Sequence, residues 1–286
     1  MEYKDVLDTM TGEYNNLTKS GRKAADYIFA HRVEAQYMSI TALAEECGVA
    51  EATISRFCCT LGFSGYNDFK LALAKASGAP AADDEVGIYG KVLPEDSITD
   101  MCKKLYATNV AAIGQTLAQI DEENVGRAVK YLSAAQRVYC FGQGGSLVIA
   151  MEAWARFITA APQFQCIEDS HMQAMAAALS TPDDVILFFS YSGATKDMLD
   201  VLRPARRRGA KIILVTHFAK SPAAAMADVT LLCGSKEGPL QSGSVAAKMG
   251  LLFIIDVLFN EYCRTNPALT EANREATAGA ISAKLL

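Results

Sequence analysis

Apolar residues in the first 77 positions recur at intervals of three and four, the spacing of a helix that buries one face. Ala24, Ala25 and Ile28 follow this spacing, and no alternating pattern predicts a strand in this part of the chain. Ser39 can cap the second helical stretch, and glycines follow the second and third stretches as turn residues. We therefore expect an all-α domain with helices over Lys19–Ala30, Ile40–Cys47, Glu51–Leu61 and Tyr66–Ala76.

From about residue 122 onward, short apolar runs rich in β-branched and aromatic residues alternate with longer helical stretches. This alternation is typical of parallel strands that are covered by helices on both faces. It predicts an α/β domain, Rossmann-like, with a parallel five-stranded sheet flanked by helices. The expected strands are Val138–Phe141, Phe164–Ile167, Val185–Phe189, Ile212–Val215 and Val229–Leu232, and the expected helices are Leu147–Ala160, Met172–Leu179, Lys196–Arg208 and Val245–Tyr262.

A segment rich in turn-forming residues separates the two patterns. Ser77–Pro94 contains three glycines, two prolines and the acidic run Asp83-Asp84-Glu85. A long helical stretch then begins at Ser97 and runs to about Ile120. We therefore predict an all-α domain over residues 1–77, a linker over residues 78–96, and an α/β domain over residues 97–286 with leading and trailing helices.

Composition and charge narrow the class of protein. No stretch reaches the roughly 18 uninterrupted apolar residues of a membrane span, and the first residues contain no signal-peptide core. We therefore expect a cytoplasmic protein without a membrane partner. The net charge of −5 argues against a protein that coats nucleic acid indiscriminately, since such proteins are strongly basic. Locally, however, residues 52–77 carry Arg56, Lys70 and Lys75 against Asp68 alone.

The eight cysteines are not spaced as metal ligands. Cys58 and Cys59 are adjacent, the other six are scattered, and the chain contains no Cys-x-x-Cys pair. Only three histidines could assist them. We therefore expect reduced thiols, no metal and no cofactor.

Residues 39–57 have the spacing of a helix-turn-helix. Leu43 and Cys47 would face Ile54 and Phe57, with Gly48 making the turn. The second helix could then lay its first exposed residues in the major groove of DNA, where an arginine pairs with guanine or with phosphate. A plain helical hairpin has the same spacing and is the alternative at this point. The candidate DNA-binding residues are Ser39, Thr41, Glu51, Ala52, Thr53, Ser55 and Arg56.

The first 75 residues or so resemble the helix-turn-helix domain of RpiR-type regulators. The resemblance is carried by Leu17-Thr18-Lys19-Ser20, by Met38-Ser39-Ile40, and by the run from Glu51 through Phe57 to Tyr66. It implies DNA binding by the second helix of the pair. The family usually has a serine just before Glu-Ala-Thr, whereas this chain has Ala50. Loss of a helix cap costs ~1 kcal/mol, so we expect a looser helix start or weaker DNA affinity.

Two of the expected strand-to-helix turns are suited to hold an anion. The first is Gly142-Gln143-Gly144-Gly145-Ser146, and the second is Ser190-Tyr191-Ser192-Gly193-Ala194-Thr195. Glycines let the backbone approach a ligand, helix N-termini offer N–H donors, and hydroxyls can surround a phosphate. The alternative for the second turn is an ordinary N-cap serine with a turn glycine. A dinucleotide fingerprint requires a third glycine where this chain has Leu147, so we do not expect NAD.

From about residue 125 to residue 262 the chain is similar to the sugar isomerase (SIS) domain, which phosphosugar isomerases share with RpiR-type regulators. The Ser-x-Ser-Gly-x-Thr turn is its most specific motif. The resemblance implies that Ser146, Ser190, Ser192 and Thr195 hold the phosphate, and that Glu237 lies near the sugar hydroxyls. The candidate effector-binding residues are Gly142, Gly144, Gly145, Ser146, Ser190, Ser192, Gly193, Thr195 and Glu237.

Two departures from the family pattern affect the expected ligand and chemistry. Gln241 and Lys248 stand where the regulators often have arginine, and the change at residue 241 would shift which sugar is bound. In isomerases of this fold a glutamate near Glu237 acts as the base, but isomerisation also needs a ring-opening acid. A lone histidine after a strand, such as His171, is more often structural. We therefore expect no catalytic residue and no enzyme activity.

These observations together predict a transcription regulator of carbohydrate metabolism. Its expected partners are double-stranded operator DNA and a phosphorylated sugar or amino-sugar effector. Two helix-turn-helix units are needed to read a two-fold operator, so we expect a homodimer or a homotetramer. The alternatives are an aldose–ketose phosphosugar isomerase with an accessory helical domain, and a phosphosugar-binding scaffold without DNA activity.

Overall fold

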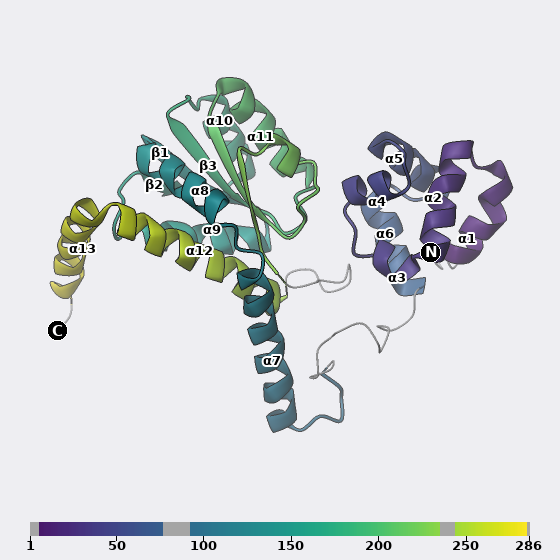
Figure 1. Ribbon diagram of the computed structural model, residues 1–286, viewed down its shortest axis with the longest axis horizontal. Coiled ribbons are helices and arrows are strands. Elements are labelled where there is room, and N and C mark those ends of the chain that lie inside the picture. Colours follow the sequence, from purple (N-terminus) through teal and green to yellow (C-terminus); the bar gives the residue numbers. More distant parts are fainter. Residues whose placement is uncertain (1–5, 77–91, 235–243, 285–286) are drawn as a thin grey trace. The chain divides into compact units, whose positions relative to one another are not determined.

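The computed structural model describes residues 6–76, 92–234 and 244–284 of the chain (Figure 1). The described residues divide into two compact units: the first covers the residues up to Thr108 together with Ser244, and the second begins at Asn109. Helix α7 (Ile98–Leu117) contains this division, and the domain limits expected from the sequence stay a prediction. None of the helices in these ranges combines the length and the hydrophobicity that a bilayer span needs.

The first unit is helical from residue 6 to residue 76, and the four predicted helices are confirmed. Two short helices, α1 and α3, were not predicted from the sequence, because each contains too few apolar residues to show a helical spacing. Helix α1 nevertheless contributes Val6 and Met10 to the core. Up to residue 76 its α-helices are, in chain order, α1 (Val6–Glu13), α2 (Lys19–Ala30), α3 (Arg32–Ala35), α4 (Ile40–Glu46), α5 (Glu51–Thr60) and α6 (Tyr66–Ala76).

The core of this unit draws large side chains from several helices. Ile28, Ile54 and Phe69 are completely buried, and the rings of Phe57 and Phe69 meet edge to face at a centroid distance of 5.6 Å. Complete burial of one such side chain stabilises a fold by roughly 1.5–3 kcal/mol. These contacts hold α2, α5 and α6 together.

Glycines in the left-handed conformation end α4 and α5. Gly48 has a φ of 61° and Gly62 a φ of 90°. After α5, Gly62 donates its N–H to the Cys59 carbonyl (3.0 Å) and Phe63 donates its N–H to the Cys58 carbonyl (3.0 Å). This arrangement satisfies the last carbonyl groups of a helix and reverses the chain.

Five parallel strands form the sheet of the second unit, as predicted. Their order in the sheet is β2-β1-β3-β4-β5. All six residues of β3 are buried, which explains its continuous apolar sequence. The strands are β1 (Arg137–Gly142), β2 (Phe164–Cys166), β3 (Asp184–Phe189), β4 (Lys211–Thr216) and β5 (Val229–Leu232).

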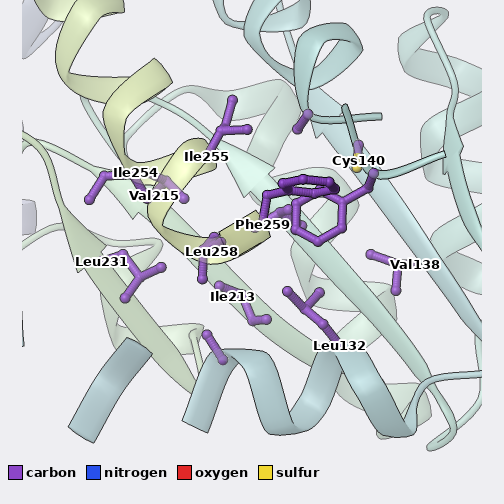
Figure 2. Close-up of a cluster of buried hydrophobic side chains, with 14 of the residues drawn as sticks. Leu132, Val138, Cys140, Ile213, Val215, Leu231, Ile254, Ile255, Leu258 and Phe259 are labelled. Atoms are coloured by element: carbon purple, nitrogen blue, oxygen red, sulfur yellow. The ribbon is translucent and has the colours of Figure 1, made fainter. Parts of the chain in front are cut away.

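Helices cover both faces of the sheet, each over its own apolar core. On one face, strand residues such as Cys140 and Val215 lie with Leu258 and Phe259 of α12 in a single cluster (Figure 2). On the other face, Phe188 packs in a cluster with residues of α10 and α11. The helices of this unit after α7 are α8 (Glu122–Ala134), α9 (Gly145–Phe157), α10 (Ser170–Ala178), α11 (Lys196–Arg208), α12 (Val245–Thr265) and α13 (Pro267–Ser282).

Candidate functional site

The packing of α4 against α5 decides which side chains of α5 face outward. Leu43 of α4 and Ile54 and Phe57 of α5 are buried in the core of the first unit. The opposite side of α5 is accessible. Of the predicted DNA contacts on this helix, Ala52 and Arg56 are exposed, and Glu51, Thr53 and Ser55 are partly exposed.

Two predicted DNA contacts outside α5 also have roles within the fold. Ser39 is buried, and its hydroxyl accepts the Ala42 N–H (3.1 Å) as the N-cap of α4. The Thr41 hydroxyl donates to Glu51 Oε1 (2.5 Å) and so connects α4 to the first residue of α5. Ala50 caps α5 without a side-chain hydrogen bond. The link between Thr41 and Glu51 therefore supports the helix start that Ala50 leaves without a side-chain cap.

A partly buried polar pair on α6 holds the backbone just before this motif. The Lys70 ammonium (2.8 Å) and the Tyr66 hydroxyl (3.0 Å) both donate to the Met38 carbonyl. Burial lowers the pKa of Lys70 to about 8 and raises the pKa of Tyr66. Sequence reasoning missed this pair, because Met38 lies about 30 positions away and no local pattern indicates the contact.

The register of the sheet brings the two candidate anion-binding turns to the same edge. Gly142, the last residue of β1, pairs with Phe189, the last residue of β3. The chain leaves β1 toward β2 on one side and later returns to β3 on the other side. Ligands of open parallel sheets bind at such a reversal of strand order, outside the carboxyl ends of the strands. The turns 143–146 and 190–195 follow these two strand ends.

The first turn depends on glycine. A methyl group on Gly142 would collide with the carbonyl group of Ser146 and would lie 2.9 Å from the Leu147 nitrogen. Gly144 has a φ of 55° and a ψ of −127°, a combination that side chains disfavour. Helix α9 starts at Gly145, two residues before the predicted start, because the glycines belong to its first turn. Gly144 and Gly145 are exposed and Ser146 is partly exposed.

The second turn is closed by its own hydroxyls. The buried Ser190 hydroxyl accepts the Gly193 N–H (3.2 Å), and the Ser192 hydroxyl accepts the Ala194 N–H (3.3 Å). Each hydroxyl still carries a proton that it can donate. Thr195 is exposed and makes no side-chain cap for α11. Gly193 has a φ of 59°, and a methyl group there would lie 2.8 Å from Ser221 Cβ.

A cation from a distant part of the chain lies beside the first turn. The Cε atom of Lys248, on α12, is 4.0 Å from the position that a Cβ atom would take on Gly145. The sequence identified Lys248 only as a departure from the family's arginine. No local signal relates Lys248 to Gly145, because the contact depends on how α12 packs against α9.

Gln173 of α10 forms hydrogen bonds at the ends of β1 and β2. Its buried amide donates to the Gly142 carbonyl (3.1 Å) and to the Ile167 carbonyl (2.7 Å). Its oxygen and the amide nitrogen of Gln143 are buried without a hydrogen-bond partner among the described residues. Gln173 thus positions the backbone of the first turn, a role that the sequence did not reveal.

Residues at the end of strand β4 support the second turn by hydrogen bonds and a ring contact. The Thr216 hydroxyl (3.0 Å) and the His217 N–H (3.1 Å) donate to the Tyr191 carbonyl. The rings of Tyr191 and His217 stack with centroids 5.0 Å apart. These contacts order the turn before any ligand arrives, which lowers the entropic cost of binding.

The remaining predicted residues lie elsewhere or are not described. Glu237, expected near the sugar hydroxyls, and Gln241 both lie outside the described residues. Asp169 accepts the Met172 N–H (2.9 Å) as the N-cap of α10, and His171 beside it is exposed.

Metal-binding groups do not gather anywhere in residues 6–76, 92–234 and 244–284. No three His, Cys, Asp or Glu side chains come together there as a metal site would require. The eight cysteines are free thiols, and Cys59 and Cys102 are exposed. The expectation that the protein needs neither metal nor cofactor stays a prediction.

Known families match both parts of the chain. Residues 4–79 match the helix-turn-helix domain of the rpiR family, and residues 131–260 match the SIS domain. The chain is 31% identical over 255 residues to an uncharacterized HTH-type transcriptional regulator of Haemophilus influenzae, a match over 89% of this chain and 88% of the relative. It is 28% identical over 256 residues to the regulator HexR of Escherichia coli, over 89% of this chain and 86% of HexR.

A solved structure resembles the chain over nearly its whole length. The Vibrio vulnificus NanR protein complexed with ManNAc-6P has a TM-score of 0.87 and 27% sequence identity. The match covers 98% of this chain and 99% of NanR. The similarity therefore includes both the helical part and the α/β part.

Proposed function

The chain belongs to the RpiR family of helix-turn-helix transcriptional regulators that carry a SIS domain, and we propose that it controls carbohydrate genes in response to a phosphorylated sugar. Its relatives are transcriptional regulators rather than enzymes. In this proposal α5 enters the major groove of operator DNA. The turns after β1 and β3 hold the phosphate of the effector.

One observation carries the effector assignment: the pairing of Gly142 with Phe189, which aligns two anion-binding turns at one sheet edge. The first turns of α9 and α11 both begin at this edge, and helix N-termini attract anions. Ser192 and Thr195 add hydroxyl donors, and Lys248 adds a positive charge. This donor set suits a tetrahedral dianion better than an unphosphorylated sugar.

The chemical class of the effector is supported by a relative. NanR of Vibrio vulnificus, 27% identical to this chain, is described in complex with ManNAc-6P, a phosphorylated amino sugar. We therefore place amino-sugar phosphates first among candidate effectors of this protein. Glu237 is the proposed contact to the sugar hydroxyls.

The DNA part of the proposal rests on the exposed side of α5. Arg56 is its exposed cation, and Ala52 is exposed one helical turn before it. Arginine pairs with guanine or phosphate, and an alanine methyl group contacts thymine. Two such units in a homodimer or homotetramer would read a two-fold operator in the cytoplasm. The effector acts by binding the DNA-competent and the incompetent arrangement with different affinities.

Thermal unfolding across a panel of phosphorylated sugars, amino sugars and sugar acids tests the effector site. A ligand at 100 times its dissociation constant adds about 2.7 kcal/mol of stability, which raises the midpoint by several degrees. We expect a stabilising sugar phosphate whose effect is lost in Ser192→Ala.

Thr265→Ala provides the control, because Thr265 is an exposed threonine at the far end of α12. It should respond to the ligand as the wild type does. A stabilising ligand that acts equally on Ser192→Ala would remove the phosphate from the 190–195 turn. A panel without any stabilising ligand would contradict effector control by sugar phosphates.

A further inference from the structure

Helix α5 carries an acidic side chain at the end that is proposed to enter the major groove. Glu51 is its first residue, is partly exposed, and lies one helical turn before Ser55 on the same side. In helix-turn-helix proteins the N-terminal residues of the second helix contact the base edges. Phosphates place a negative charge every ~1.7 Å along the axis of duplex DNA, so they repel a carboxylate in the groove. A glutamate at this position therefore weakens DNA binding unless a base donates a hydrogen bond to it.

Thr41 of α4 holds this carboxylate in place. Its hydroxyl donates to Glu51 Oε1 (2.5 Å), a bond that joins the two helices of the motif across 10 positions of sequence. The second oxygen, Oε2, makes no hydrogen bond to any residue within the described ranges. A free glutamate side chain loses conformational freedom when it binds, and the existing bond to Thr41 reduces that cost. One carboxylate oxygen is thus held, and the other is available to a ligand.

A carboxylate distinguishes cytosine from the other three bases. Its oxygens accept hydrogen bonds but cannot donate them. In the major groove guanine presents two acceptors, thymine an acceptor and a methyl group, and adenine an acceptor beside its amino group. Cytosine presents a donor, its N4 amino group, without an acceptor. The exposed neighbours of Glu51 do not compete for this base, because Ala52 offers only a methyl group and Arg56 only donors.

We propose that Glu51, positioned by Thr41, selects cytosine at one base pair in each half of the operator. The inference rests on the DNA-binding part of the proposed function and adds a base and two roles to it. Glu51 contacts the base, and Thr41 is a positioning residue that acts through Glu51. An acid at the positive end of a helix also has a structural role, but that role would affect the binding of all DNA sequences alike.

Selection from random duplex DNA tests the base preference. The full-length chain, both without ligand and with ManNAc-6P, is incubated with a pool of random duplexes, and the bound DNA is sequenced. We expect a motif with one cytosine in each half at which the other bases are disfavoured about tenfold. Glu51→Gln should change this preference from cytosine to adenine, because the amide both donates and accepts and so matches the adenine edge.

Thr41→Val tests the positioning role, because it removes the hydroxyl and keeps the shape of the side chain. It should reduce the preference for cytosine at the same position about threefold or more, while the affinity for unrelated DNA stays unchanged. Thr41→Ser keeps a hydroxyl and should restore the wild-type preference. Fluorescence anisotropy with the selected duplex, and with a duplex changed only at that base pair, measures the preference of each variant.

Glu46→Gln is the matched control, because Glu46 is an exposed glutamate at the last position of α4. It loses the same negative charge as Glu51→Gln but lies at the other side of the turn from the first residue of α5. It should keep the base preference of the wild type. Urea denaturation establishes that each variant is folded under the conditions of the binding experiment.

Three outcomes would overturn the inference: the same preferred bases in the wild type and Glu51→Gln, an equal loss of affinity for every sequence in Thr41→Val, or the same change of base preference in Glu46→Gln. A motif that residue 51 does not affect would contradict this inference and leave the proposed function standing. A wild type that enriches no motif under either condition would contradict the proposed function, and the inference with it.

Discussion

Single polar side chains, buried or partly buried, hold several backbone positions in the two units. Gln173 donates to the carbonyl at the end of β1, and Lys70 donates to the carbonyl before α4. Asp184, the first residue of β3, accepts the Thr181 N–H of the preceding turn. Loss of a hydrogen bond to a buried polar group costs free energy, so the bonds that these residues make favour one backbone arrangement. Their effects on stability can be measured residue by residue.

Asp184→Asn should destabilise the α/β unit. Its buried carboxylate accepts the Thr181 N–H (2.7 Å) and pairs with the Arg137 guanidinium (2.8 Å). Hydrogen bonds to a charged group contribute roughly 1.5–3 kcal/mol, so we expect the free energy of unfolding to fall by about 2 kcal/mol at pH 7. Urea denaturation of the wild type and the variant measures the difference.

The same variant has a defined pH dependence. Burial by itself would raise the pKa of Asp184, but the hydrogen bonds from Arg137 and Thr181 outweigh burial and hold the pKa below its ordinary value of 3.8. The stabilisation is therefore present above pH 3.8 and is lost as the pH falls through the lowered pKa. The difference in free energy of unfolding between wild type and Asp184→Asn should therefore become smaller in acid. For the exposed neighbour variant Asp183→Asn we expect almost no difference from wild type at any pH. A gap that stays constant below pH 3.8 would contradict this assignment.

Lys70→Met should change how the stability of the helical unit depends on pH. The pKa of Lys70 is about 8 in the fold and 10.5 in the unfolded chain. Between these values the unfolded chain binds a proton that the folded chain does not, so the wild type gains stability relative to the variant as the pH rises from 8 to 10.5. Urea midpoints across this range measure the gain. Lys75→Met on the same helix is the control. If the urea midpoint depended on pH equally in both variants, the role of Lys70 would be refuted.

At the scale of elements, the starts of helices determine both candidate sites. Helices α9 and α11 begin at the proposed phosphate site, and α5 begins at the proposed DNA surface. Ser39 caps α4 and Asp169 caps α10 through side-chain hydrogen bonds. Thr195 at α11 and Ala50 at α5 make no such bond. An uncapped start leaves N–H groups available to phosphate, either of a sugar or of DNA.

Ala50→Ser should stabilise α5. Ala50 has a φ of −79° and a ψ of 151°, which is the backbone conformation that an N-cap residue needs. A serine there would supply the missing cap and raise the free energy of unfolding by ~1 kcal/mol. Urea denaturation measures the gain, with Ala52→Ser as the control because residue 52 lies inside the helix. A gain no larger than that of Ala52→Ser would show that a serine at residue 50 does not cap α5.

At the scale of the whole molecule, two units with separate cores carry the two proposed activities. A side chain in one core does not support the site in the other. Variants on the surface of one unit should therefore change one activity and leave the other intact.

Arg56→Ala should weaken operator binding by about 1–3 kcal/mol and reduce its salt dependence, because one cation fewer contacts the DNA. The affinity for the sugar phosphate should be unchanged. Fluorescence anisotropy with a promoter fragment at several salt concentrations measures the first property, and thermal shift measures the second. Lys23→Ala on α2 is the control for a general loss of charge. Loss of both activities in Arg56→Ala would contradict their assignment to separate units.

Much of the architecture followed from the sequence because it depends on local physics. The period of apolar residues distinguishes helix from buried strand, and turn glycines such as Gly48 and Gly62 mark where helices end. The order of elements then restricts the α/β part to a parallel sheet. The two candidate anion-binding turns could be recognised for the same reason, since each is a contiguous run of glycines and hydroxyl residues at a strand end.

The tertiary structure alone decided which groups meet. Lys248 lies beside Gly145, and Lys70 and Tyr66 lie beside Met38, although these partners are about 100 and about 30 positions apart. Packing likewise assigns Ser39 and Thr41 to hydrogen bonds within the fold, although their sequence positions equally suit DNA contacts. A periodic pattern records only whether a side chain is buried, whereas its partner depends on the packing of distant elements. The sequence by itself therefore determined the class of fold and the location of the turns, and the packed structure determined the neighbours of each side chain.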